Sequence, residues 1–496
     1  MTTAGIYEAI RGTLGDGERL PKGYEPPQEH VAPNEIRFMA GARDGIGVFH
    51  ESRRDPGDAV TEILGCLRAG DTDRIASVIA DTGTLTIVDP LIDAIQSAGD
   101  LDVSAVRTYA ESLAFRSSDQ EQVKLGIALL GLLNLDDLPE DQDRLVRLGL
   151  CEEFTLYVVV AATRWKHGEY VVWHLAKNTD GWGKIHAVTR LTPTTFEISD
   201  WLLRHGCANT VMDAYLGLEC AIKGDLIDAL RRDDLDDDLF DGVCVIMDAL
   251  SDEGPVAGFS AYEHTDEAIA RFLHHAITKA HTLSQLSHIL NVETAIPHLD
   301  LADKNDLLAL CDRIKAVPHW VSLIESSVNT QDDDFFRAVS AADRLNVDVN
   351  APVLDAIKAD PVKNGWLASR LFHDRGTAED IVSLYERTLP LAEIASGMGD
   401  YLFSPTHGAE CDCLDTLLIA LEDYPLLGEA LVGTSLMSPV VRNRYLACGT
   451  LEAWVGQLSQ PLKTFSPSLH ETLSRVAAAE VDDTVKDRMA ALLVVM

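Results

Sequence analysis

Residues able to recognise a ligand gather between positions 173 and 201. The stretch 164–224 holds four of the chain's seven tryptophans. Rigid aromatic surfaces beside charged and hydrogen-bonding groups are typical of interface hot spots. We therefore expect a patch that grips a peptide or protein segment, formed by Trp173, His174, Trp182, Lys184, His186, Arg190, Asp200 and Trp201. The alternative is that these tryptophans fill a core between helices and that Arg190 pairs with an acidic neighbour.

Metal-ligating residue types occur in one compact motif. His407, Cys411 and Cys413 form H-x3-C-x-C, whose soft ligands could hold zinc or form a redox pair. A structural zinc site needs four ligands, and no second cysteine pair of suitable spacing lies nearby. His274, His281 and His288 recur every seven residues, which separates them by about 10.5 Å along a helix. We expect no metal site, with the H-x3-C-x-C residues as the weak candidates.

Cofactor motifs are missing from the sequence. There is no G-x-x-x-x-G-K-[ST], no G-x-G-x-x-G after a strand, no H-E-x-x-H and no G-x-S-x-G. Counted from Asp234 in the aspartate-rich run at 233–242, Leu239 stands where a calcium loop requires glycine and Val245 where it requires glutamate. We expect no cofactor, and a cofactor-free enzyme with a pocket near the central tryptophans remains the alternative to a binding scaffold.

The elements that would position the tryptophans are paired helices. After the turn residues 178–181, apolar residues recur at helical spacing over 182–191, and Pro193 ends that helix. Thr194 or Thr195 can cap a second helix through 201–203, which Gly206 is expected to stop in a left-handed conformation. Helix, proline corner, helix and glycine stop form one repeat unit.

Residues 1–57 differ from the rest because they are rich in proline and glycine. A short helix is expected over 6–14. Residues 36–39 (IRFM) and 46–50 (IGVFH) flank Asp44-Gly45, a pair that favours a tight turn, so we predict a β-hairpin that caps the first repeat. A loosely packed tail is the alternative.

From residue 58 onward the sequence predicts helices throughout. We divide the chain into the N-terminal segment 1–57, N-terminal helical repeats 58–330 and C-terminal helical repeats 331–496. A boundary near the acidic turn 233–242 is also open. The run 396–413 breaks the helical pattern and is expected to be an irregular loop, a type of segment that often carries function.

Three segments resemble the second helix of HEAT repeats. Val123-Lys124, Val441-Arg442 and Val485-Lys486 align, each followed by apolar residues, and the last two lie 44 residues apart, within the HEAT and armadillo period. This resemblance implies an all-α fold, an armadillo-like α-solenoid of antiparallel helix pairs. A generic α-solenoid is the alternative.

A second resemblance covers separate pieces of the chain. They are similar to a family of bacterial proteins often labelled "limonene hydroxylase", and comprise DGIGVFH (44–50), DGWGKIHAVTRL (180–191), DWLLRHGC (200–207) and VVRNRYLACGTLEAW (440–454). The label implies monoterpene oxidation. Because these pieces match a helical-repeat pattern and contain no oxygenase motif, we carry over only the expectation of fold.

Charge and composition narrow the partners. Lys and Arg total 41 against 79 Asp and Glu, a formal net charge of −38, which repels phosphates and anionic lipids. We expect no nucleic acid and no membrane, and a protein or peptide partner or a second copy of the chain. Two explanations of the negative charge remain open: it attracts a basic partner, or it keeps the protein soluble in a salty cytoplasm. Nine scattered cysteines and no signal peptide indicate a cytoplasmic protein.

Overall fold

The computed structural model describes residues 5–27, 38–52, 54–254 and 256–494, and within these ranges every regular element is a helix. An isolated bridge between Tyr401 and Val440 is the one β-type pairing among them. The predicted all-α fold is thus confirmed for this part of the chain. None of its helices combines the length and apolarity needed to cross a bilayer.

The chain divides into two compact units, Met1–Val317 and Pro318–Met496. The division lies upstream of the boundary at 330 set from the sequence. The helices of the first unit are α1 (Ile6–Leu14), α2 (Ala42–His50), α3 (Ala59–Ala69), α4 (Thr72–Thr82), α5 (Thr84–Ser97), α6 (Val103–Arg116), α7 (Gln120–Leu130), η1 (Leu135–Asp137), α8 (Pro139–Gly149), α9 (Glu152–Ala162), α10 (Gly168–Asn178), α11 (Trp182–Arg190), α12 (Phe196–Trp201), η2 (Leu202–Gly206), α13 (Ala214–Lys223), α14 (Leu226–Leu230), α15 (Asp237–Ser251), η3 (Phe259–Ala261), α16 (Thr265–Lys279), α17 (Leu283–Ala295), η4 (Ile296–His298) and α18 (Lys304–Lys315).

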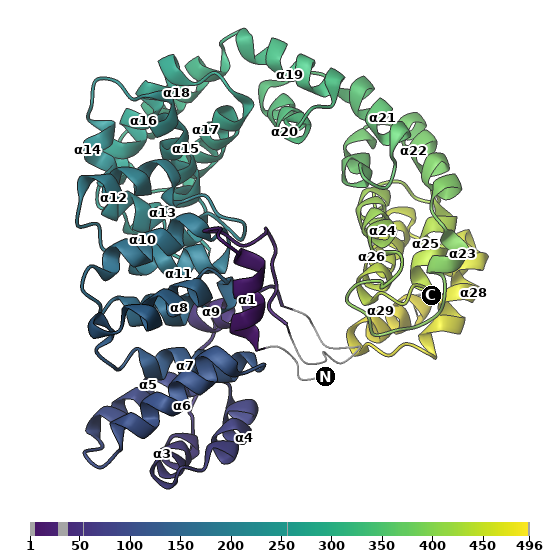
Figure 1. Cartoon of the computed structure of the whole chain (residues 1–496). Coiled ribbons are helices and arrows are strands. Elements are labelled where there is room, and N and C mark those ends of the chain that lie inside the picture. The colour runs from purple at the N-terminus through teal and green to yellow at the C-terminus, as the bar shows by residue number, and fades with distance from the viewer. Residues whose placement is uncertain (1–4, 28–37, 53, 255, 495–496) are drawn as a thin grey trace. The chain divides into compact units, whose positions relative to one another are not determined.

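The odd-numbered helices of this unit form a continuous layer. Each of α3, α5, α7, α9, α11, α13, α15 and α17 packs against the next. Helices α6, α8 and α10 cover α7, α9 and α11 from one side, and α14, α16 and α18 continue that second layer (Figure 1). The apolar core lies between the two layers, where Val123, Phe154 and Ile185 are fully buried.

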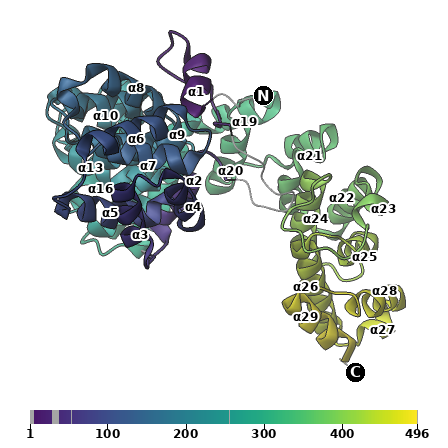
Figure 2. The same cartoon turned by 60° about the horizontal axis from the view of Figure 1, so that its bottom comes forward.

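The second unit repeats the same helix-on-helix construction. Helices α24, α26 and α29 pack in succession, with α25 and α28 alongside them (Figure 2). Its helices are α19 (His319–Thr330), α20 (Phe335–Leu345), α21 (Asn350–Ala359), η5 (Gly365–Leu371), α22 (Arg375–Thr388), α23 (Leu391–Ile394), α24 (Gly408–Leu421), α25 (Glu429–Leu436), α26 (Val441–Leu458), α27 (Leu462–Phe465), α28 (Pro467–Ala477) and α29 (Asp483–Val494).

Local sequence explains the helix pair around the tryptophans. Helix α11 stops at Arg190, before Pro193, and the Thr195 hydroxyl caps α12 by accepting from the Ile198 amide. The expected left-handed stop at Gly206 is wrong, because Gly206 lies inside η2 with a negative φ. A Cβ at Gly206 would lie 3.0 Å from the Cys220 sulfur, so this glycine serves close helix packing.

The predicted β-hairpin is also wrong. Residues 42–50 form helix α2, so Asp44-Gly45 lies within a helix. Of the expected first strand, residues 36 and 37 lie outside the described residues. The left-handed residue of this region is Gly41, with φ of 76°, which directly precedes the helix. Glycine at 45 has a different purpose, which the packing of Trp182 explains below.

The irregular segment of the second unit is shorter than predicted. Helix α24 begins at Gly408, so Cys411 and Cys413 lie on its first turns and the loop ends at His407. Two main-chain hydrogen bonds hold the middle of this loop against the start of α26. The Tyr401 amide donates to the Pro439 carbonyl, and the Val441 amide donates to the Tyr401 carbonyl.

Candidate functional site

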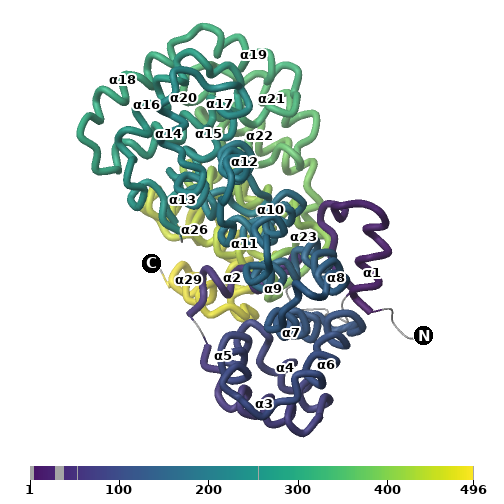
Figure 3. The backbone as a smooth tube through the Cα atoms, turned by 60° about the vertical axis from the view of Figure 1, so that its left-hand side comes forward, coloured from purple at the N-terminus to yellow at the C-terminus, as the bar shows by residue number. Residues whose placement is uncertain are grey.

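Helix α2 packs against α11 and lies beside α9, in the middle of the odd-numbered layer (Figure 3). Its side chains and backbone reach four successive helices of that layer. We call the surface beneath it the α2 face, formed by Lys124 of α7, Glu153 and Tyr157 of α9, Trp182 and His186 of α11, and Tyr215 of α13. The segment that occupies it, residues 38–52, is the α2 segment.

One end of the α2 face is a buried ionic cluster. The Lys124 ammonium, 1% exposed, lies 2.6 Å from Glu153, 2.9 Å from Glu121 and 2.9 Å from Asp44 of α2. The Tyr157 hydroxyl donates to Asp44 at 3.1 Å, and the Gly41 amide donates to Glu153 at 2.7 Å. The α2 segment therefore enters the cluster through both a side chain and its backbone.

The pKa values of the cluster follow from burial and from Lys124. Burial raises the pKa of Asp44, and Lys124 offsets this only in part. Burial also acts on Glu121, but Lys124 and the hydrogen bonds from Thr84 together outweigh it and lower the pKa of Glu121. Burial opposes the charge of Lys124, yet the surrounding carboxylates, Asp44 foremost, raise its pKa. Lys124 is thus held as a cation, while burial disfavours the ionised form of Asp44.

The middle of the α2 face is the ring of Trp182. A Cβ added to Gly45 would overlap Cδ2 and Cε3 of that ring, so only glycine lets α2 approach this closely. Gly41 is equally constrained, since its added Cβ would lie 2.6 Å from the Glu152 carbonyl oxygen and 3.1 Å from Cβ of Trp182. Gly41 thus sets where α2 begins, and Gly45 sets how closely α2 approaches the ring of Trp182.

An aromatic group closes the other end. The Phe49 ring of α2 has its centroid 4.9 Å from Tyr215, 6.0 Å from Trp182 and 6.2 Å from His186. Its neighbour His50 forms a hydrogen bond with the Tyr215 hydroxyl. Aromatic rings at these separations attract one another beyond the effect of area burial.

His186 lies at the base of this aromatic group. Its side chain is fully buried, and neither ring nitrogen has a hydrogen-bond partner among the described residues. Burial, followed by the nearby Arg190, lowers the pKa of His186 to about 3. The imidazole is therefore neutral at physiological pH and behaves as an aromatic packing group.

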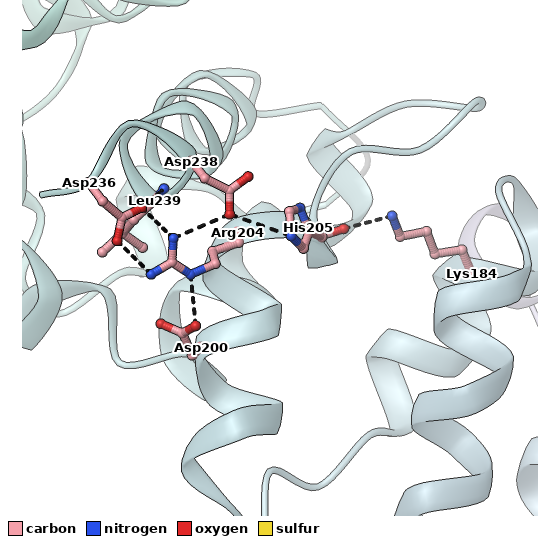
Figure 4. A network of polar contacts seen from close by, with 7 residues as sticks. All are labelled: Lys184, Asp200, Arg204, His205, Asp236, Asp238 and Leu239. Atoms are coloured by element: carbon pink, nitrogen blue, oxygen red, sulfur yellow. Dashed lines mark hydrogen bonds and ion pairs between the residues drawn. The ribbon is translucent and has the colours of Figure 1, made fainter.

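Lys184 and Asp200, both expected to bind a ligand, instead bond to the chain itself (Figure 4). The buried Lys184 ammonium donates to the carbonyls of His205 at 2.8 Å and Ala208 at 2.5 Å, where η2 ends. Asp200 accepts from Arg204 at 2.7 Å, and the same guanidinium contacts Asp236 and Asp238 at the start of α15. These residues join neighbouring helix pairs.

The contacts of the other predicted residues are with helices α10, α11 and α12. The Trp173 and Trp201 rings pair edge to face at 6.4 Å, and Lys177 lies 3.8 Å above Trp173. His174 is half-buried, and Arg190 donates to the His186 carbonyl at 3.3 Å. Of the eight predicted residues, the structure thus brings only Trp182 and His186 to the α2 face.

Sequence reasoning missed Lys124, Glu153, Phe49 and Tyr215. Lys124 carried a signal, because it interrupts an apolar helical run, VKLGIALL, on the side that Val123 and Ile127 bury. A lysine at such a position needs a carboxylate partner. The identity of that partner could not be found, because Asp44 is far away along the sequence.

The three weak metal candidates do not converge. His407 contacts Glu393 at 3.2 Å, and the Cys413 thiol donates to the Val362 carbonyl at 3.5 Å. Cys411 instead lines a cavity. In the described part of the chain, no group of three or more His, Cys, Asp and Glu side chains is arranged to hold a metal ion.

Each unit also has a cavity away from the α2 face among the described residues. A cavity of about 370 Å³ between α15 and α17 is lined by Ser284, Cys244 and His288, and His288 pairs with Asp248 at 2.6 Å. A cavity of about 260 Å³ lies between the 395–407 loop, α24 and α26. None of the eight residues predicted from the sequence lines either of them.

Comparison with known proteins does not assign the chain to a family. No family model matches the sequence, and no curated protein matches it.

Proposed function

We propose that this chain is a HEAT-like α-solenoid scaffold that binds a short helical segment of a protein partner on the α2 face, in the place that α2 occupies. The observation that carries the proposal is the α2 segment itself, which lies on this face as a bound peptide would. Helix-in-groove recognition depends on a few anchor side chains along one side of a short helix. Asp44 and Phe49 are such anchors, and Gly45 lets the helix lie close to the ring of Trp182 between them.

The α2 helix buries few of its own residues, so we expect that a competing helix can exchange with it. Only Ala42, Asp44 and Gly45 of its helix are buried, and Val48 is exposed. A nine-residue helix is marginal by itself, so its order depends on these few contacts. Elements with little buried apolar surface open at low free energy, which makes this segment the part of the unit that a competing helix could displace.

The anchors define the partner segment. Position 45 must be glycine because Trp182 leaves no room for a Cβ. An aromatic residue four positions later would fill the space between Tyr215 and His186. The preceding position must carry a hydrogen-bond acceptor for the Tyr157 hydroxyl. The expected pattern is therefore Asp or Asn, then Gly, then three variable residues, then an aromatic residue.

A peptide selection tests this proposal. The G45A variant of the full chain cannot seat α2, while G12A carries the same change at a glycine of α1 whose added Cβ meets no atom within 4 Å. A displayed library of short helical peptides is selected on both proteins. We expect G45A to enrich the Asp/Asn-Gly-aromatic pattern and G12A to enrich nothing. Equal enrichment on both proteins, or none on a folded G45A, would refute the α2 face as a partner site.

A further inference from the structure

The cavity of the second unit combines a carboxylate floor with an apolar lip. It occupies about 260 Å³, and its lining includes Leu402, Phe403, Asp412, Asp415, Ile419 and Arg442. These residues come from the loop, from one side of α24 and from the start of α26. The cavity lies wholly within the second unit and is independent of the α2 face.

Asp415 forms the floor and is held in one orientation. Its carboxylate accepts a hydrogen bond from Asn443 Nδ2 at 2.6 Å and forms an ion pair with Arg442 Nε at 2.9 Å. Asn443 is itself fixed, because it accepts from the Ser438 hydroxyl and donates to the Cys411 carbonyl, both at 2.9 Å. Burial raises the pKa of Asp415 to about 6 despite these donors. A further cation beside it would be favoured.

Arg442 shows which chemistry satisfies this carboxylate, yet it is loosely held. Its side chain is 70% exposed, and its guanidinium reaches Asp415 through one nitrogen. An exposed ion pair of this kind contributes little to stability. The Arg442 side chain can therefore swing away from Asp415 while Asn443 keeps the carboxylate in place.

The lip is apolar and faces solvent. Leu402 is 66% exposed, Phe403 77% and Ile419 51%. The loop cannot easily turn Leu402 and Phe403 inward, because the backbone of the adjacent Tyr401 is hydrogen-bonded to Pro439 and Val441. Guanidinium groups stack on aromatic faces, and the aliphatic part of an arginine side chain packs on apolar surface.

We propose that this cavity binds an arginine side chain from an exposed segment of a partner protein. The guanidinium pairs with Asp415 and Asp412, and its stem lies against Leu402 and Phe403. Arginine fits better than lysine because its planar fork can satisfy a carboxylate through two parallel hydrogen bonds and stack on Phe403. The net charge of −38 attracts a basic partner toward the site.

Labelled pentapeptides with one central arginine test the site against the full-length protein, by fluorescence anisotropy at low salt. The comparison peptides carry citrulline, lysine or glutamate in place of arginine. We expect the arginine peptide to bind at least tenfold more tightly than the citrulline peptide, with lysine between them. Equal binding of arginine and citrulline, or tighter binding of the glutamate peptide, would overturn the proposal.

Four variants locate the binding on the molecule. Asp415→Asn should weaken arginine-peptide binding at least tenfold, and Phe403→Ala, at an exposed position, should weaken it several-fold. Arg442→Gln should strengthen binding because it removes the internal competitor. Asp380→Asn, an exposed charge change on α22, should leave binding unchanged. The proposed pose would be contradicted if Phe403→Ala bound the arginine peptide with full affinity and Arg442→Gln bound it more weakly than wild type. Because Phe403 is exposed, its substitution does not disturb the core.

Discussion

Removing Lys124 probes the link between the α2 segment and the helical layer. Lys124→Met keeps the length of the buried stem but leaves Asp44, Glu121 and Glu153 without the cation that they share at 2.6 to 2.9 Å. Breaking a buried ion pair from one side costs about 3–5 kcal/mol. At about 2–4 °C for each kcal/mol, we expect the melting temperature of the first unit to fall by about 10 °C at pH 7.

The deficit should depend on pH in a defined direction. Without Lys124, burial and mutual repulsion raise the folded-state pKa of the remaining carboxylates above their unfolded values. A carboxylate with a raised folded-state pKa gains folding stability as the pH falls, because the folded state then binds the proton more readily. The difference between Lys124→Met and wild type should therefore shrink between pH 7 and pH 5.

Asp44→Asn separates the role of charge from that of shape. Burial already raises the pKa of Asp44, and an asparagine oxygen can still accept from the Tyr157 hydroxyl, so we expect a loss below about 1 kcal/mol. In Lys124→Met this second change removes one uncompensated carboxylate and should restore part of the lost stability.

Thermal unfolding followed by circular dichroism measures these effects, and hydrogen exchange of the α2 amides reports docking directly. Lys166→Met, at an exposed position, is the matched control and should melt like wild type. A Lys124→Met protein that melts within about 2 °C of wild type at pH 7 would refute the reasoning. A deficit that grows toward pH 5 would refute it equally.

Two further predictions concern the α2 face, and a third concerns a buried ion pair of the second unit. His186→Phe should stabilise the first unit by about 1 kcal/mol at pH 7 in urea titrations, because it removes unpaired ring nitrogens. In wild type the folded-state pKa of His186 is lowered to about 3, so protonation favours the unfolded state as the pH falls. Between pH 6.5 and pH 5 wild type should therefore lose about 2 kcal/mol of stability relative to this variant. Gly45→Ala should speed amide exchange in α2 at least tenfold, while Gly12→Ala leaves it unchanged. Arg444→Met removes a fully buried cation from Glu480, at 2.6 and 2.7 Å, and should lower the stability of the second unit alone by about 3–5 kcal/mol, with exchange in α10 and α11 unaffected.

Local sequence was sufficient to predict those elements whose ends are set by neighbouring residues in the chain. Helix α11 could be predicted because a turn precedes it and Pro193 follows it, and the Thr195 cap follows from side-chain chemistry. The all-helical class could be predicted because apolar residues recur at helical spacing in one segment after another.

Local sequence failed where distant residues decide. Asp44-Gly45 has the composition of a turn, yet its glycine is needed for the ring of Trp182, which no local pattern reveals. Cys411 and Cys413 were interpreted as possible metal ligands in a loop, whereas they lie on the first turns of helix α24. The eight predicted binding residues lay close together in sequence, but the helices direct them toward different neighbours, so that only Trp182 and His186 meet under α2.

The central claim is that the α2 face holds a replaceable helical segment, and binding in trans tests it most directly. A labelled peptide of residues 38–52 is titrated against full-length G45A and G12A proteins and followed by fluorescence anisotropy. We predict binding to G45A at least tenfold tighter than to G12A, and no binding when the peptide itself carries the G45A change. Equal affinity for both proteins, or no binding to a folded G45A protein, would contradict the claim.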